Sequence, residues 1–387
     1  MKRILPAIVI SQFFCTSLWF AGNAVIPDII KNAGIGPVAS ANLTSAVQLG
    51  FILGTLIFAL FTISDRFSPS RVFFTCSIIA GLFNLGMIIS PVPPLQLFLF
   101  RLFTGFFLAG IYPVGMKIVS DHYKAGLGRS LGFLVGALVL GTAFPHLLKS
   151  LTASLPWKYV IISTTLLSFA GGLIILLFVP DGPYRKPGQN LKFTAFITGF
   201  SNKNFRVASL GYFGHMWELY SFWAFVPVIL MANKNYYQND LNIPLLSFLV
   251  IAGGGIACVI SGLLSQQFGV KRIATISLIL SCSCCLLSPL FLFSHSSPVL
   301  IAFLVFWGIV VIADSPLFST LVAQNAREDI KGTSLTIVNC IGFSITIISI
   351  QFIKLLSDTI SARFIYMLLA IGPVIGLIAL LKNKKSS

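Results

Sequence analysis

The chain has 387 residues, of which 56% are hydrophobic and only 9% are charged. An ordinary soluble domain carries about 25% charged residues because water surrounds it on every side. The composition therefore excludes a sizeable soluble domain. The formal net charge of +16 does not indicate a nucleic-acid partner, because the basic residues lie mainly on short connections between apolar runs.

Apolar runs long enough to cross about 30 Å of hydrocarbon, at about 1.5 Å per helical residue, recur along the chain. They predict six spans in the first half, at 4–29, 38–62, 71–91, 94–119, 129–152 and 157–179. Six more are predicted at 205–231, 244–266, 272–293, 297–323, 332–354 and 360–381. The first run lacks a small-residue cleavage site, so we expect an uncleaved span instead of a signal peptide.

One long polar connection, beginning at Pro180, separates the sixth predicted span from the seventh. We therefore expect an N-terminal six-helix bundle at 1–180, a cytoplasmic linker at 181–204 and a C-terminal six-helix bundle at 205–387. Of the 26 basic residues, nineteen lie on the side of both termini, six lie on the other side, and Arg101 lies within a span. The positive-inside rule then places both termini in the cytoplasm.

The two halves share local patterns at nearly constant spacing, as expected for a transporter built from internal repeats. Residues 65–71 and 266–272 follow the second and eighth spans at an offset of 201 and share a Phe and a final Arg. The fourth and tenth spans align at an offset of 203, which pairs Gly105 with Gly308 and Pro113 with Pro316.

These patterns resemble those of the major facilitator superfamily, whose loop signature G-x-L-a-D-R-x-G-R-R-x follows the second span and recurs after the eighth. The first copy here keeps the following members: Asp65, Arg66, Phe67 and Arg71. The second copy lacks the acidic-basic pair but keeps these: Gly262, Leu264, Gly269, Lys271 and Arg272. Arg101 and Gly105 are similar to the family's R-x-x-x-G pattern in the fourth span. The family's fifth-span antiporter signature is poorly matched around Pro145, and no subfamily is identified.

The resemblance implies a fold of twelve transmembrane helices in two pseudo-symmetric six-helix bundles, and a monomer surrounded by membrane lipid. It also implies a conformational latch on the cytoplasmic side, formed by Asp65, Arg66, Arg71, Lys271 and Arg272. In the alternative reading the charges of this loop are solvated and contribute little. The short loops and tails are what we expect of a bacterial inner-membrane protein.

Three ionisable residues lie inside predicted spans, namely Arg101, Glu218 and Asp314. Each costs at least about 2.5–3.5 kcal/mol on insertion scales, so such residues usually have a function. We expect Arg101 to bind an anionic group of the substrate through its planar fork, or to brace the backbone or polar groups of a neighbouring span. We expect Glu218 or Asp314 to carry a proton with His215 as relay, or else to be structural carboxyl groups.

Aromatic and amide side chains of the spans are further candidates for contact with an organic solute: Trp19, Asn23, Gln48, Tyr112, Tyr220, Trp223, Asn339 and Gln351. The seven cysteines lie in hydrophobic runs, and the group at 282–285 lacks the spacing of a metal site. No metal and no cofactor is predicted.

The leading prediction is a secondary active transporter that moves a small polar organic solute by alternating access, coupled to protons, with an anionic solute as one option. Export of a metabolite or drug by proton antiport is the alternative within transport. An integral membrane enzyme acting on a lipid-linked substrate is more remote, because no nucleophile, base or metal ligands gather at one interface. A passive channel is disfavoured because no repeated polar ring is evident.

Overall fold

The computed structural model describes residues 4–33, 39–89, 93–123, 127–152, 154–185, 197, 199–327 and 331–382. Within these ranges every regular element is helical, which confirms the predicted all-α class. Contacts divide the chain into two compact units, residues 1–190 (unit 1) and 191–387 (unit 2). The division falls inside the connection predicted at 181–204.

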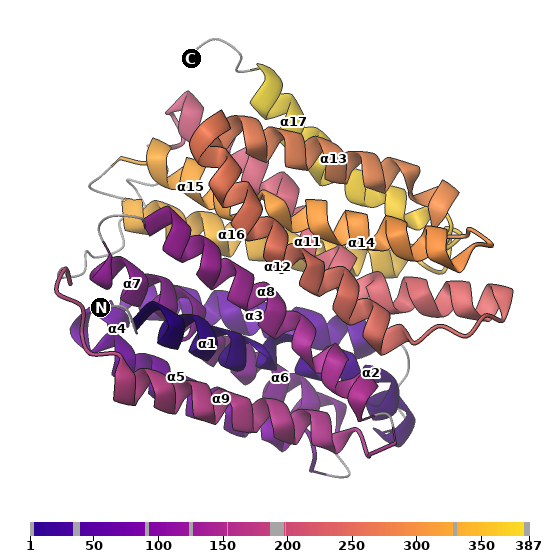
Figure 1. Cartoon of the computed structure of the whole chain (residues 1–387), viewed down its shortest axis with the longest axis horizontal. Coiled ribbons are helices and arrows are strands. Elements are labelled where there is room, and N and C mark those ends of the chain that lie inside the picture. Colours follow the sequence, from indigo (N-terminus) through magenta and orange to yellow (C-terminus); the bar gives the residue numbers. More distant parts are fainter. Residues whose placement is uncertain are drawn as a thin grey trace. The chain divides into compact units, whose positions relative to one another are not determined.

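Unit 1 has nine helices among its described residues (Figure 1): α1 (Ile4–Thr16), α2 (Leu18–Ala33), α3 (Ala39–Leu60), α4 (Ile63–Arg66), α5 (Pro69–Gly86), α6 (Pro94–Leu108), α7 (Tyr112–His122), α8 (Leu127–Leu151) and α9 (Lys158–Phe178). Helix α3 packs along α6, and α5 packs along α9. The four-residue α4 lies in the loop that carries Asp65 and Arg66.

Unit 2 has seven α-helices and one 3-10 helix among its described residues: α11 (Lys203–Tyr237), α12 (Ile243–Phe268), α13 (Val270–Phe291), α14 (Ser297–Ala313), α15 (Ser315–Asn325), α16 (Lys331–Leu356), η2 (Ile365–Ala370) and α17 (Ile371–Lys382). Helix α12 packs along α14, and α11 packs along α16 and α17.

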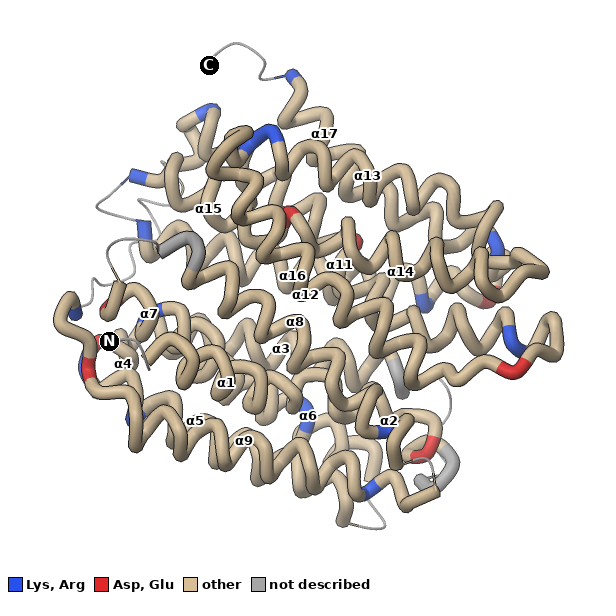
Figure 2. The backbone as a smooth tube through the Cα atoms, viewed as in Figure 1, with Lys and Arg blue, Asp and Glu red and all other residues tan. Residues whose placement is uncertain are grey.

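Ten helical stretches of the described residues are long and apolar enough to cross a membrane. They correspond to ten of the twelve predicted spans. The other two predictions, 71–91 and 205–231, correspond to α5 and α11, which do not meet the same test because polar residues such as Asn84 in α5 and Glu218 in α11 lower their hydropathy. Most Lys and Arg residues lie at helix ends (Figure 2).

The first predicted span is two helices, because the chain bends between Thr16 and Leu18. The hydroxyl of Thr16 donates to the carbonyl of Gln12 at 2.7 Å, and that of Ser17 donates to the carbonyl of Phe14 at 2.6 Å. Such back-bonding by Ser and Thr competes with the helix ladder and often bends it. Leu18 and Trp19, the first two residues of α2, are buried.

The fourth and tenth predicted spans are also broken, and they break at equivalent places. Helices α6 and α7 begin at residues 94 and 112, and α14 and α15 begin at 297 and 315, so both starts differ by 203. Pro113 and Pro316 lie in the first turn of α7 and α15, where a missing N–H costs little. The structure thus shows the spacing predicted from Gly105, Gly308 and the two prolines.

The same offset relates a close helix contact in unit 1 to one in unit 2. A Cβ added at Gly105 of α6 would lie 1.9 Å from the Val47 carbonyl oxygen of α3. A Cβ added at Gly308 of α14 would lie 2.0 Å from the Val250 carbonyl oxygen of α12. Only a glycine permits this backbone approach, which is the usual role of small residues between membrane helices.

Candidate functional site

Arg101 is completely buried in unit 1 and contacts the bend between α1 and α2. Its Nη1 donates to the Leu18 carbonyl at 3.1 Å, and its Nη2 donates to the Trp19 carbonyl. Gly22 gives the guanidinium room, since a Cβ there would lie 3.0 Å from Nε. These contacts are those of the bracing alternative, and a substrate-binding role for Arg101 stays a prediction.

His215 and Asp314 form a buried pair in unit 2. The His215 Nδ1 lies 2.8 Å from the Asp314 Oδ1, and both side chains are almost fully buried. Asp314 occupies the break between α14 and α15, where its carbonyl accepts from the amides of Leu317 and Phe318. Within the described chain, the Asp314 Oδ2 and the His215 Nε2 have no hydrogen-bond partner. The pair is an acid beside a base at a point where the helix is interrupted.

Glu218 lies one turn after His215 on α11, but its carboxylate is held differently. It accepts from the Trp307 Nε1 at 2.7 Å, from the Ser281 Oγ at 2.9 Å and from the Cys285 Sγ at 3.2 Å. All three donors are neutral and belong to α13 and α14. Fully satisfied polar groups of this kind rigidify a core, so Glu218 is fixed by the bundle more tightly than Asp314.

The predicted solute-contacting residues of unit 2 gather on α11 and α16. The Tyr212 hydroxyl donates to the Asn339 Oδ1 at 2.7 Å, and the Tyr220 ring lies 5.3 Å from that of Trp223. Tyr220 also lies 5.4 Å from Phe343 of α16. These side chains form a buried aromatic cluster with one amide, a composition that suits contact with an organic solute.

In unit 1 the corresponding residues lie on α2 and α3. The Asn23 Nδ2 donates to the Thr44 Oγ1 at 2.7 Å, and the Trp19 ring lies 4.8 Å from that of Phe51. Tyr112 is half-buried at the first position of α7, beside the break of its span.

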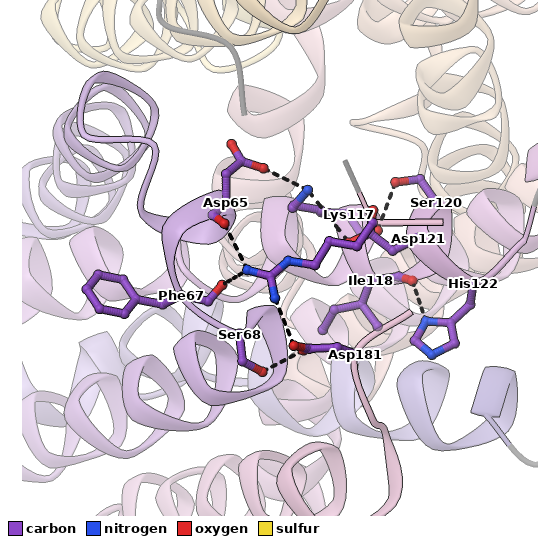
Figure 3. Close-up of polar contacts among 10 residues, drawn as sticks. Asp65, Phe67, Ser68, Lys117, Ile118, Ser120, Asp121, His122 and Asp181 are labelled. Carbon is purple, nitrogen blue, oxygen red and sulfur yellow. Dashed lines mark hydrogen bonds and ion pairs between the residues drawn. The ribbon is translucent and has the colours of Figure 1, made fainter. Parts of the chain in front are cut away.

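A polar cluster joins one end of unit 1 to the first residues after α9 (Figure 3). The Lys117 Nζ lies 2.7 Å from the Asp65 Oδ1 and 3.6 Å from the Asp121 Oδ2. The Arg185 Nη1 donates to the Asp181 Oδ2 at 2.8 Å, while its Nη2 donates to the carbonyls of Asp65 and Phe67, each at 2.8 Å. We call these five charged residues, Asp65, Lys117, Asp121, Asp181 and Arg185, the end cluster. It fixes the Asp65 loop within its own unit.

The other residues of the predicted latch also lie at the ends of helices. Arg66 ends α4, Arg71 lies in the first turn of α5, and Lys271 and Arg272 lie in the first turn of α13. The Arg66 Nε donates to the Thr62 Oγ1 at 3.1 Å. Arg71 is exposed and lines a cavity of about 430 Å³ with Ser68 and Asp181. In unit 2, Lys271 lines a cavity of about 150 Å³, and Arg272 is exposed. A latch between the halves stays a prediction.

Arg185→Ala is expected to loosen the Asp65 loop without unfolding unit 1. Charge-assisted bonds to two carbonyls would be lost, but the site is partly exposed, so we expect a stability loss of no more than about 1 kcal/mol. Hydrogen exchange of residues 61–71 should become faster. Arg206→Ala, which removes a 3.4 Å contact to the Phe200 carbonyl in unit 2, is the matched control. If hydrogen exchange of residues 61–71 is unchanged in Arg185→Ala, the loop does not depend on Arg185 for its structure.

A family model described as Major Facilitator Superfamily matches residues 8–350, and a second match covers 208–386. The chain belongs to the major facilitator superfamily. It is accordingly a multi-pass membrane transporter of a small-molecule solute, and the family resemblance seen in the signature loops is confirmed.

Superfamily relatives agree on the fold. "Putative transporter AraJ" of Escherichia coli (strain K12) is 22% identical over 282 residues, which cover 72% of this chain and 69% of AraJ. The nucleoside transporter NupG, as a D323A mutant, is 15% identical with a TM-score of 0.74, covering 98% of this chain and 100% of NupG. The human organic anion transporter MFSD10 (TETRAN) is 14% identical with a TM-score of 0.78, covering 98% and 99%.

Several contacts of the candidate site residues were not predicted from the sequence. The three donors to Glu218 lie 63 to 89 residues after it in the chain, namely Ser281, Cys285 and Trp307. Arg185 reaches carbonyls 118 and 120 residues earlier. The contact of Lys117 with Asp121 could have been predicted, since opposite charges four residues apart on a helix lie on one face.

Proposed function

We propose that this transporter is a secondary active carrier that couples solute movement to protons through the His215–Asp314 pair. The 2.8 Å contact between the His215 Nδ1 and the Asp314 Oδ1 supports it most directly. A buried carboxyl group beside an imidazole can be neutral or charged at modest cost, because either partner can hold the proton. Its position at a helix break favours alternation between two arrangements.

Glu218 is the second candidate for the coupling proton. Its three neutral donors support a positioning role instead, because they stabilise one arrangement of the carboxylate. Asp314 offers an oxygen without such a donor. We therefore assign the exchangeable proton to the pair, with His215 as relay.

The solute in this proposal is a small polar organic molecule. The anionic character predicted from Arg101 is weakened, because both of its Nη groups donate to carbonyls of its own unit. One structural neighbour is a nucleoside transporter and another is an organic anion transporter, so the same fold serves different solutes.

The proposal also includes an inner-membrane monomer surrounded by lipid, with both termini in the cytoplasm. The distribution of basic residues supports this orientation. Symport and antiport would use the same pair, so the sign of the pH response distinguishes import from export.

Purified protein in liposomes is expected to show saturable counterflow of its solute, first identified by a thermal-shift screen. The flux through a carrier must saturate because each protein molecule binds and moves a limited number of solute molecules per cycle. The thermal-shift screen can find the solute because a ligand that binds the folded protein raises its unfolding midpoint. An imposed pH gradient should then drive accumulation. Linear flux would contradict a carrier, and saturable counterflow that is indifferent to pH would contradict proton coupling.

A further inference from the structure

Unit 1 has a second buried polar face, which the proton pair does not use, on α2 and α3. Four residues spaced by four, three and four share one side of α3: Thr44, Gln48, Phe51 and Thr55. Two residues of α2, four positions apart, contact this side of α3. Asn23 bonds to Thr44, and the Trp19 ring contacts that of Phe51. Gln48 therefore lies between a polar contact and an aromatic contact.

Gln48 is fully buried, and neither its Oε1 nor its Nε2 has a hydrogen-bond partner within the described chain. The Thr55 Oγ1, two turns further along the same side, is also without one. Buried polar groups are nearly always paired, and leaving one unpaired is costly. A primary amide that keeps both donor and acceptor unused is suited to pairing with a ligand.

We propose that this face binds the solute and that Gln48 selects it. The group recognised is planar and uncharged and presents a donor beside an acceptor, as do a carboxamide, a lactam and the edge of a nucleobase. A glutamine amide pairs with such an edge through two hydrogen bonds. Trp19 and Phe51 supply aromatic surface for the ring that carries it. The inference rests on the proposed carrier function and names the class of its solute.

Among the described side chains, no cation is available on this face, which argues against an anionic group. Arg101 and Lys149 both contact α2, but the Arg101 Nη groups donate to the carbonyls of Leu18 and Trp19, and the Lys149 Nζ pairs with Asp28 at 2.7 Å. A carboxylate would have to displace these bonds, and it would face the Gln48 carbonyl with like partial charge. An uncharged group with a donor beside an acceptor does not need the Arg101 bonds to break and is not repelled by the Gln48 carbonyl.

Gln12 of α1 provides a matched control. It too is fully buried with both amide atoms unpaired in the described structure. Its Oε1, however, lies 2.5 Å from where a Cβ of Gly115 would be, and Phe73 is a further neighbour of that position. Gln12 thus packs against α7, whereas Trp19 and Phe51 lie on α2 and α3.

The test is the thermal midpoint of the purified full-length protein with five probes: nicotinamide, nicotinate, benzamide, benzoate and uracil. Nicotinamide, benzamide and uracil should raise the midpoint, and the two carboxylates should not. Gln48→Leu should raise the half-maximal nicotinamide concentration about tenfold or more, since two hydrogen bonds are lost. Gln12→Leu should leave it unchanged.

Three results would overturn the inference: a larger shift with a carboxylate than with its amide, an unchanged response in Gln48→Leu, or no shift with any probe. Gln48→Glu, which keeps the shape but exchanges donors for acceptors, tests the same point if Gln48→Leu does not fold. Binding in detergent needs no proton gradient. A failure of these probes therefore does not contradict solute accumulation driven by a pH gradient, and a failure of proton coupling does not contradict the selectivity among the probes.

Discussion

Asp314→Asn is expected to abolish solute accumulation driven by a pH gradient, down to the level of protein-free liposomes, while solute exchange continues. Asparagine keeps the size of the side chain and can still pair with His215 at the 2.8 Å distance seen for the carboxylate. It cannot take up or release a proton. Uphill transport requires that change of charge, whereas exchange of solute for solute does not.

The choice of an isosteric substitution matters because a buried pair is sensitive to the loss of one partner. Removing His215 with leucine would leave a buried carboxyl group without its base, and breaking a buried pair in this way costs about 3–5 kcal/mol. Loss of transport in that variant would then report on folding. Asp314→Asn avoids this ambiguity.

Two comparison variants complete the experiment. Glu218→Gln should reduce rates without abolishing the pH response, because its carboxylate already has three neutral donors. Asp240→Asn should behave as the unchanged protein, since Asp240 is fully exposed and pairs with Lys234 at 3.3 Å. Full pH-driven activity in Asp314→Asn, with loss in Glu218→Gln, would move the coupling site to Glu218.

Sequence alone was enough to predict the helical class, the superfamily and the repeat in the fourth and tenth spans. Lipid requires every backbone group to be paired within a helix, so apolar runs of sufficient length have few alternatives. Gly105 and Gly308 were visible as a repeat because close helix contacts admit no other residue. The twelve-span count was less secure at α5 and α11, where polar residues interrupt the apolar run.

The partners of the buried charges could not be predicted, for a physical reason. Arg101 binds two backbone carbonyls, and a carbonyl has no signature in the sequence. Glu218 binds a serine, a cysteine and a tryptophan whose types are common in membrane helices and whose approach depends on helix rotation. The pairing of His215 with Asp314 also depends on how the helices are rotated, so it could not be predicted. The sequence did single out both residues, and Asp314 is of the ionisable type that is costly inside a membrane.

Gly105→Ala and Gly308→Ala are expected to destabilise the protein by similar amounts, because each adds the same methyl group to the same contact. The new Cβ would lie 1.9 Å from the Val47 carbonyl oxygen or 2.0 Å from that of Val250. Both obstacles are backbone, so two helices must move apart along their length. Overpacking of this kind costs about 1–3 kcal/mol, which should appear as a lower thermal midpoint and a smaller folded fraction on size-exclusion chromatography.

Gly132→Ala and Gly262→Ala are the controls, one for each unit. No atom outside the local helix lies within 4 Å of a Cβ added at either position, so alanine should be neutral or slightly stabilising, as its helix propensity predicts. The equality of the two main variants is the sharper test. If Gly105→Ala lowers the midpoint and Gly308→Ala does not, the 203-residue repeat describes where the helices begin but not the force that holds them together. If both midpoints fall together while both controls keep theirs, the same close backbone contact stabilises each unit.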